Sequence, residues 1–450
     1  MSDNYDLKDI NKKISAMILP VAIEGVLQMT AGLVMMGMIG RIDVIAVSAL
    51  GISLRITQTV WALFKGITTG ASVYVAQYFG AKQYGKMKHV IQQTVMSTII
   101  LVVILQALIY IYSPALLGIF DPSPELLEKA IIYIRTVSFG LPFLAIMLVI
   151  GGSLQGMGNA KTPMMITMIM NIFNIAVGYV LIFGKFGFEP MGIKGAAIAT
   201  ASSQFTAAVL GLYVLLSRNG VLHSYLNKSF FSIDMPQIRA IYRVGLPSSM
   251  ESMFWQIAAI ILTRAILTYG ETAFAAHQLG MQAESISYMP ATGFSIAATA
   301  FIGQALGAND KKLAKIYLRQ IFKGSIAITA VSVIILVGFP KSMMSLLTDN
   351  PEVIRLGSIY LILMGIVQIP QNASNVLMGA MRGAGYTNIP MIVAGTGLWG
   401  IRVPFTLAVV YLLKFPITAI WVVMSIDLAF RFLFNLVLYN RKNIYDKTMI

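Results

Sequence analysis

Residues 381–391 of this chain read MRGAGYTNIPM, and residues 154–164 read LQGMGNAKTPM. Both strings have the pattern G-x-G-x-x-x-x-P-M, and they lie 227 positions apart. The same offset, without a gap, relates many residues between positions 20 and 163 to residues of the second half: Pro20 to Pro247, Glu24 to Glu251, Gln77 to Gln304, and Gly80 to Gly307. The chain therefore contains an internal duplication, and each copy is expected to form the same structural unit.

The composition is that of a chain whose main solvent is lipid. Hydrophobic residues make up 57% and charged residues 11% of the 450 residues, and the mean hydropathy is +0.77. Soluble domains have roughly 45–50% apolar and about 25% charged residues. Twelve apolar segments are long enough to cross a membrane as helices. They lie near 14–38, 46–70, 90–113, 128–155, 163–184, 191–216, 243–268, 273–297, 317–339, 352–380, 388–412 and 416–440.

These segments predict an all-α integral membrane protein with twelve transmembrane helices. Each copy holds six spans, an even number, so both copies enter the membrane from the same side. We therefore expect two six-helix lobes, residues 1–216 and 243–450, related by a pseudo-two-fold axis along the membrane normal and joined by a cytoplasmic linker at 217–242. Two such lobes enclose a central cleft, where transporters bind substrate and alternate its access by rocking.

The net charge of +15 is a topology signal. Lysine and arginine gather in the loops after the even-numbered spans, and the opposite loops hold few cations. The positive-inside rule then places both termini in the cytoplasm of a multi-pass cell-membrane protein. This distribution argues against nucleic acid as a partner, and membrane lipids are the expected surroundings.

No pattern in the chain is typical of an enzyme. The chain has no cysteine, no phosphate-binding Walker loop, no H-E-x-x-H and no G-x-S-x-G, so we expect neither a catalytic site, a metal site nor a cofactor. The repeated G-x-G follows no strand and is interpreted as a short turn between helices. Transport would then draw on a Na⁺ or H⁺ gradient, or on the gradient of the substrate.

Three glutamates inside predicted spans are candidates for cation or proton coupling, because intramembrane charges are costly and often functional. Glu24 and Glu251 each follow the proline of an LP pair by four residues, and hydrogen bonding within the helix bundle is the alternative role for both. Glu284 lies deeper in its span, and its counterpart at the offset of 227 is Thr57. An ion pair with Arg264 of the preceding span is the alternative for Glu284.

For the other polar residues within the spans, structural roles are the main expectation. Asp427 and Arg431 are spaced i, i+4, and Arg402 of the neighbouring span can approach them, so we expect a structural ion network. Asn171 and Asn174, one turn apart, either join helices by hydrogen bonds or line the cleft. His277 is expected to be packed and hydrogen-bonded rather than to relay protons.

The motifs resemble those of the multidrug and toxic compound extrusion (MATE) family over roughly residues 15–440. The resemblance is carried by LP-x3-E-x3-Q at 19–28, VAQYFGA at 75–81, QGMGNAKTP at 155–163, MRGAGYTNIP at 381–390 and WGIRVPF at 399–405. It implies a two-lobed antiporter that exports cationic amphipathic small molecules in exchange for Na⁺ or H⁺, and we expect it to work as a monomer. The alternative, a flippase for a lipid-linked saccharide, would need several cations in its central cavity and further helices.

Three acids that the resemblance leads one to expect are absent. Met35 stands where family members commonly carry an aspartate, and Trp255 and Gln371 stand where the NorM-like branch carries acids. We therefore expect Glu284 to dominate coupling. The residues predicted to line the substrate cleft are Met35, Gln28, Asn171, Asn174, Gln256, Tyr288 and Gln371.

Overall fold

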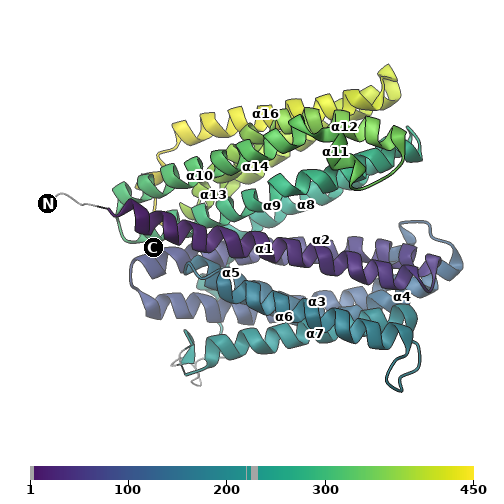
Figure 1. The fold of residues 1–450 in the computed structure, drawn as a ribbon. Helices are drawn as coiled ribbons and strands as arrows, with labels where there is room; N and C mark the ends of the chain where they lie inside the picture. Colours follow the sequence, from purple (N-terminus) through teal and green to yellow (C-terminus); the bar gives the residue numbers. More distant parts are fainter. Residues whose placement is uncertain (1–4, 219, 224–231) are drawn as a thin grey trace. The chain divides into compact units, whose positions relative to one another are not determined.

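The computed structural model describes residues 5–218, 220–223 and 232–450 (Figure 1). Within these ranges the regular structure is helical, and no strand is present. The first half contains α1 (Leu7–Gly40), α2 (Val44–Gly80), α3 (Tyr84–Gly118), α4 (Pro124–Ser138), α5 (Leu141–Gly156), α6 (Lys161–Phe183) and α7 (Gly192–Leu216).

The second half follows the same order, with more interruptions. It contains α8 (Met235–Leu267), α9 (Glu271–Gly307), α10 (Lys311–Gly338), α11 (Pro340–Ser345), α12 (Pro351–Ile366), α13 (Gln368–Gly383), α14 (Asn388–Gly397), the π-helix η3 (Leu398–Arg402), α15 (Val403–Leu407), the π-helix η4 (Ala408–Leu413), α16 (Ile417–Arg441) and the short 3₁₀-helix η5 (Ile444–Asp446).

Each of the twelve predicted spans coincides with a helix or with a helix pair. Two spans are bent: α4 meets α5 at 51°, and α12 meets α13 at 50°. In the described part of the chain, nine spans are long and apolar enough to cross a membrane, or up to eleven when each bent pair counts as one. The remaining helix, α9, is long but less apolar, because polar groups such as His277 and Glu284 interrupt it.

The contacts divide the chain into two compact units. The C-terminal unit comprises the described residues up to 22 together with 76–82 and 246–450, and the N-terminal unit comprises 23–75 and the described part of 83–245. The helix α2 therefore runs from one unit into the other. The lobe boundaries drawn from the duplication stay a prediction. Of the predicted linker, residues 219 and 224–231 lie outside the described residues, and α8 already begins at Met235.

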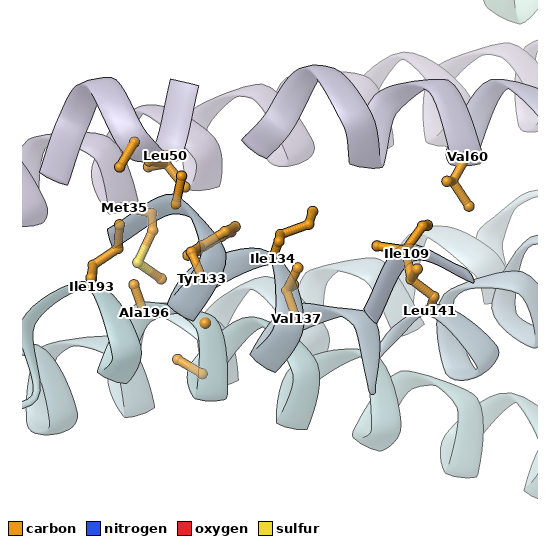
Figure 2. Packing of buried hydrophobic residues seen from close by; sticks show 14 of the residues in the cluster. Met35, Leu50, Val60, Ile109, Tyr133, Ile134, Val137, Leu141, Ile193 and Ala196 are labelled. Atoms are coloured by element: carbon orange, nitrogen blue, oxygen red, sulfur yellow. The ribbon is translucent and has the colours of Figure 1, made fainter. Parts of the chain in front are cut away.

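Each unit has its own apolar core. In the N-terminal unit, Met35 of α1, Leu50 of α2 and Tyr133 of α4 point toward one another and toward Ile193 of α7 (Figure 2). The core of the C-terminal unit is centred on aromatic rings, which include the fully buried Trp421. Lipid tails are as apolar as these side chains, so close packing and interhelical hydrogen bonds are the main forces between the helices.

The penultimate span, from Asn388 to Leu413, contains both π-helical segments. A π-turn accommodates more residues than an α-turn, and such turns are frequent at functional sites. Arg402 is the last residue of η3 and is buried. The wide turn thus ends with one of the few cations inside a span.

Candidate functional site

Glu284 lies midway along α9, and its carboxylate accepts hydrogen bonds from two other helices. Tyr360 Oη of α12 donates to one oxygen at 2.7 Å, and Gln368 Nε2 of α13 donates to the other at 2.7 Å. Gln368 follows the 50° bend between these two helices, so the bend brings its buried amide to the carboxylate. A carboxylate has about four acceptor sites. Glu284 therefore keeps sites for a proton or a small cation.

The structure distinguishes between the two roles that the sequence left open for Glu284, namely coupling and an ion pair with Arg264. Its partners are the neutral groups of Tyr360 and Gln368. Among the ion pairs of the described residues, none joins Glu284 to Arg264. The predicted alternative, a permanent ion pair on Glu284, is therefore not the arrangement in this structure.

Aromatic packing holds the hydroxyl of Tyr360 in place. The Tyr360 ring is almost completely buried and meets His277 at 5.4 Å and Trp421 at 5.5 Å between ring centroids, both edge to face. Such contacts are worth about 0.5–1.5 kcal/mol each beyond the area that they bury. The predicted packing role of His277 agrees with this placement, although its Nδ1 has no hydrogen-bond partner among the described residues.

Glu251, the second glutamate of the duplicated pair, is neutralised by an arginine. Arg382 Nη2 lies 2.6 and 2.7 Å from its two carboxylate oxygens. The Glu251 side chain is only 11% exposed and the Arg382 side chain 18%, so water screens the ion pair little. A carboxylate that is held in this way does not exchange cations while the pair persists. Of its two predicted roles, the structural one describes Glu251 in this conformation.

Glu24, the matched residue of the first copy, has weaker and neutral hydrogen-bond donors. Thr167 Oγ1 lies 3.3 Å and Gln155 Nε2 lies 3.5 Å from its carboxylate oxygens. The three side chains border a cavity of about 30 Å³, enough for a water molecule, which Lys65 and Gly152 also line. The acid of the first copy therefore borders a small cavity, whereas that of the second copy is closed off.

Asp427 binds two arginines inside the C-terminal unit. Arg402 Nε donates to Asp427 Oδ2 at 2.7 Å, and Arg431 Nε donates to Oδ1 at 2.8 Å. The structure thus brings together the three residues that were predicted to form an ion network. All three are buried, and breaking such a pair leaves an uncompensated charge.

Trp255 covers the arginine side of this network. The guanidinium carbon of Arg431 lies 4.6 Å and that of Arg402 5.2 Å from the centroid of its ring. Two cations and one carboxylate leave an excess positive charge, which the π face of the ring attracts. Gly397 leaves room for the ion network itself, because a Cβ there would lie 2.4 Å from Asp427 Oδ1 and 2.5 Å from Arg431 Nε. The aromatic ring therefore stands where the resemblance led us to expect an acid.

The predicted cleft residues are placed in different surroundings. Met35 is 5% exposed and packs in the core of the N-terminal unit, so it does not line a solvent-filled space in this conformation. The tight helix packing beside Gly178, which faces the Met35 methyl group, explains this outcome. The exposed side chains are Gln28 and Tyr288, the half-buried ones are Asn174, Gln256 and Gln371, and the buried one is Asn171.

Several of these amides hold polar atoms without partners. Asn171 Nδ2, Asn174 Oδ1 and Gln371 Oε1 have no hydrogen-bond partner within the described ranges, although each atom is buried. Such atoms cost free energy unless water or a ligand satisfies them. The role of the amides in lining a cleft stays a prediction. No group of three histidines, aspartates or glutamates in the described ranges could hold a metal ion.

Sequence reasoning missed the partners of the acids. Tyr360, Gln368, Gln155 and Thr167 were not singled out, because uncharged polar residues are common in membrane helices. The offset of 227 does contain a signal for one of them: it matches Gln155 of the first copy to Arg382 of the second. Both side chains contact the glutamate of their own copy.

The sequence profile of the MatE family matches residues 20–180 and 247–408, one match in each copy of the duplication. The chain belongs to the MatE family. It is therefore a membrane transporter rather than a member of an enzyme family, and its many apolar helices make it a multi-pass membrane protein.

Curated relatives cover nearly the whole chain. The probable multidrug resistance protein NorM of Thermotoga maritima is 30% identical over 95% of this chain and 91% of its own length. The probable multidrug resistance protein YoeA of Bacillus subtilis is 26% identical over 91% of this chain and 89% of its own length.

Solved structures show the fold. A MOP superfamily transporter from Pyrococcus furiosus superposes with a TM-score of 0.86 at 20% identity and covers 98% of this chain and 97% of its own. The Vibrio cholerae MATE transporter VcmN gives a TM-score of 0.87 at 17% identity over 97% of this chain and 99% of its own. The predicted fold class, an all-α protein of twelve membrane helices in two lobes, is thereby confirmed.

Proposed function

We propose that this MatE transporter exports cationic, amphipathic small molecules from the cytoplasm in exchange for H⁺ or Na⁺, and that Glu284 is its coupling acid. The names of the relatives from Thermotoga maritima and Bacillus subtilis, both probable multidrug resistance proteins, support the efflux of varied small molecules. The contacts of Glu284 are the observation that carries the coupling assignment.

The three acids inside the spans of the C-terminal unit are compensated differently. Glu24 of the N-terminal unit, whose hydrogen-bond donors are also neutral side chains, stays the second candidate. Glu251 and Asp427 are held by arginines, so taking up a proton or Na⁺ would first require breaking a buried ion pair. Glu284 is held by a hydroxyl and an amide, which can turn toward other partners without leaving a charge behind. Among these three acids, Glu284 therefore exchanges a cation with the least rearrangement.

The proposal includes the orientation of the chain in the cell membrane. Lysine and arginine follow the even-numbered spans, which supports cytoplasmic termini. The flippase alternative would use internal cations to bind a pyrophosphate. Two of the internal arginines, Arg402 and Arg431, are already committed to Asp427, which favours the export of cations.

The test is efflux of a fluorescent organic cation from proteoliposomes under separately imposed Na⁺ and proton gradients. Glu284→Gln should remove the acceleration by the coupling gradient and leave downhill movement of the dye. Tyr360→Phe should weaken coupling without abolishing it, because the amide of Gln368 remains. Glu271→Gln, an exposed acid at the start of the same helix, is the matched control and should behave as the native protein.

Each result decides one part of the proposal. Gradient-driven efflux by Glu284→Gln at the native rate would overturn the coupling assignment. A native protein that moves the dye equally with and without either gradient would overturn antiport itself. The gradient that drives the native protein identifies the coupling ion.

A further inference from the structure

The last residues of the chain fold back onto the C-terminal unit. We refer to residues 443–450, which follow α16, as the tail (Figure 1). Ile444 is fully buried, and Asp446 forms a 2.5 Å ion pair with Lys311 at the start of α10. Lys447 Nζ lies 3.8 Å from the ring centroid of Tyr386, in the turn that follows α13. The tail is thus fixed at several points along its length.

The tail ends on a residue of α2. The Met449 backbone N–H donates to Gln77 Oε1 at 2.7 Å, and Gln77 Nε2 donates to the carbonyl of Gly383 at 2.9 Å. Gln77 is fully buried. Its amide therefore connects the tail to the last residue of α13, with one bond accepted by the amide oxygen and one donated by the amide nitrogen.

Gln77 lies in a close helix crossing. A Cβ on Gly80 of α2 would lie 1.9 Å from the carbonyl oxygen of Gln304, and a Cβ on Gly307 of α9 would lie 2.0 Å from that of Gln77. Only glycine allows two backbones to approach this closely. The offset of 227 matches Gln77 with Gln304 and Gly80 with Gly307, so the contact is reciprocal between the two copies.

At this crossing the first copy of the sequence joins the C-terminal unit, as it also does through the described residues of α1 up to Ala22. The last residues of α2, from Ala76, belong to the C-terminal unit, while the same helix up to Val75 belongs to the other. Any rocking of one lobe against the other must therefore bend α2 here or open the crossing. A group that holds Gln77 in place resists that opening.

We propose that the tail is a latch: by binding Gln77 through the backbone of Met449, it holds the crossing of α2 and α9 closed and slows its opening. When the tail leaves, Gln77 loses one buried hydrogen bond and the crossing keeps only its helix contacts. The tail is anchored partly by the Lys311–Asp446 pair, whose side chains are about half exposed, so salt screens this anchor. The functional meaning of the latch rests on the proposed antiport, but its existence does not.

The first experiment measures opening without measuring transport. The chain has no cysteine, so Ala76→Cys supplies a single thiol at a fully buried position that faces Gly303 in the crossing. In this background, Met449→Pro removes the N–H that binds Gln77, and Met449→Ala keeps it as the matched control. Thiol labelling by a water-soluble maleimide should be about fivefold faster with proline, the effect of one net hydrogen bond of about 1 kcal/mol. Equal labelling of the two variants would overturn the latch.

The second experiment fixes the tail covalently. The double variant Gln77→Cys/Met449→Cys places one thiol on each partner of the Met449 N–H···Gln77 contact, and formation of the disulfide on oxidation is verified by mass spectrometry before transport is measured. Oxidation should then stop dye efflux and reduction should restore it, while neither single-cysteine variant responds. Undiminished efflux by the oxidised double variant would show that the tail need not leave Gln77, and would overturn the proposal. Because the reduced protein reports efflux in the same sample, this result is distinguishable from a failure of the proposed function.

Discussion

The two copies of the duplicated sequence place a glutamate at the same point of their first long helix and surround it differently. Glu251 is bound by Arg382 at 2.6 Å, whereas Glu24 lies 3.5 Å from Gln155, the residue that matches this arginine. Lys65 lines the cavity beside Glu24, and its match in the second copy is Thr292. The duplication thus preserved the acid and changed the position of its compensating charge. These two replacements beside the acid, of Gln155 and of Lys65, accompany the change from a site bordered by a cavity to a closed one.

The largest loss of stability is expected when Arg382 of the second copy is replaced by glutamine, the residue at the matched position 155 of the first copy. Arg382→Gln leaves Glu251 buried without its partner, and removing one member of such a pair typically costs about 3–5 kcal/mol. We expect a clear fall in the melting temperature of the detergent-solubilised protein. Arg382→Lys, which keeps the charge, should lose less. An unchanged melting temperature for Arg382→Gln would show that the pair contributes no stability.

A second difference between the copies is the ring of Trp255, whose match in the first copy is Gln28. Trp255→Leu removes the aromatic face from both guanidiniums, a loss of about 0.5–2 kcal/mol. The melting temperature should fall by a smaller amount than for Arg382→Gln. Gln28→Leu, the matched change at an exposed position, should leave it unaltered. Equal effects of the two leucine variants would contradict the stacking account.

Replacing Glu24, the acid of the first copy, by a neutral side chain should lower the free energy of unfolding by a smaller amount again. Glu24→Gln keeps the shape of the side chain and can still bond to Thr167, so we expect a loss near one net hydrogen bond, about 1 kcal/mol. The same melting experiment checks this value. A loss as large as that of Arg382→Gln would mean that Lys65 holds Glu24 as firmly as Arg382 holds Glu251, and the contrast between the copies would disappear.

The smallest expected change in stability concerns Asp43, in the loop between α1 and α2, outside the membrane. Asp43 accepts hydrogen bonds from the backbone at the start of α2 and binds Lys129 Nζ at 2.6 Å, whereas its match in the second copy is Gly270. The Lys129 ammonium, followed by the backbone N–H groups, lowers the pKa of Asp43 below its usual value. The stabilisation is therefore present above the unfolded pKa of about 3.9 and is lost as the pH falls through the lower folded pKa.

Melting at a series of pH values checks this sign. The native protein should lose stability below about pH 4, and part of that loss should be absent from Asp43→Asn, which has no carboxyl group to protonate. Because the pair is partly exposed, the difference should stay below about 1 kcal/mol. Identical pH profiles for the two proteins would contradict the role of Asp43.

The sequence predicted the fold more completely than the site. The length and hydropathy of the spans and the constant offset between Pro20 and Pro247 depend only on local composition and order, so the helices and the duplication could be read directly. The partners of Glu284 could not, because Tyr360 and Gln368 are 76 and 84 residues away on other helices. Pro370 marks the bend between those helices, but no local pattern shows that the bend faces Glu284. The burial of Met35 likewise depends on which face of α1 packs inward.

The wide turn at Leu398–Arg402 has a consequence for the genetics of the duplication. The matched residues 171–175 of the first copy lie in the uninterrupted helix α6. Adding one residue to an α-helix turns all later side chains by about 100°, and a π-turn absorbs such an addition locally. The two copies therefore differ in helix geometry at matched positions of this span. Deleting Gly400 places Arg402 one position earlier in this span, inside the turn that holds it opposite Asp427, so a change of three nucleotides would disturb a buried ion pair while leaving every charged residue encoded.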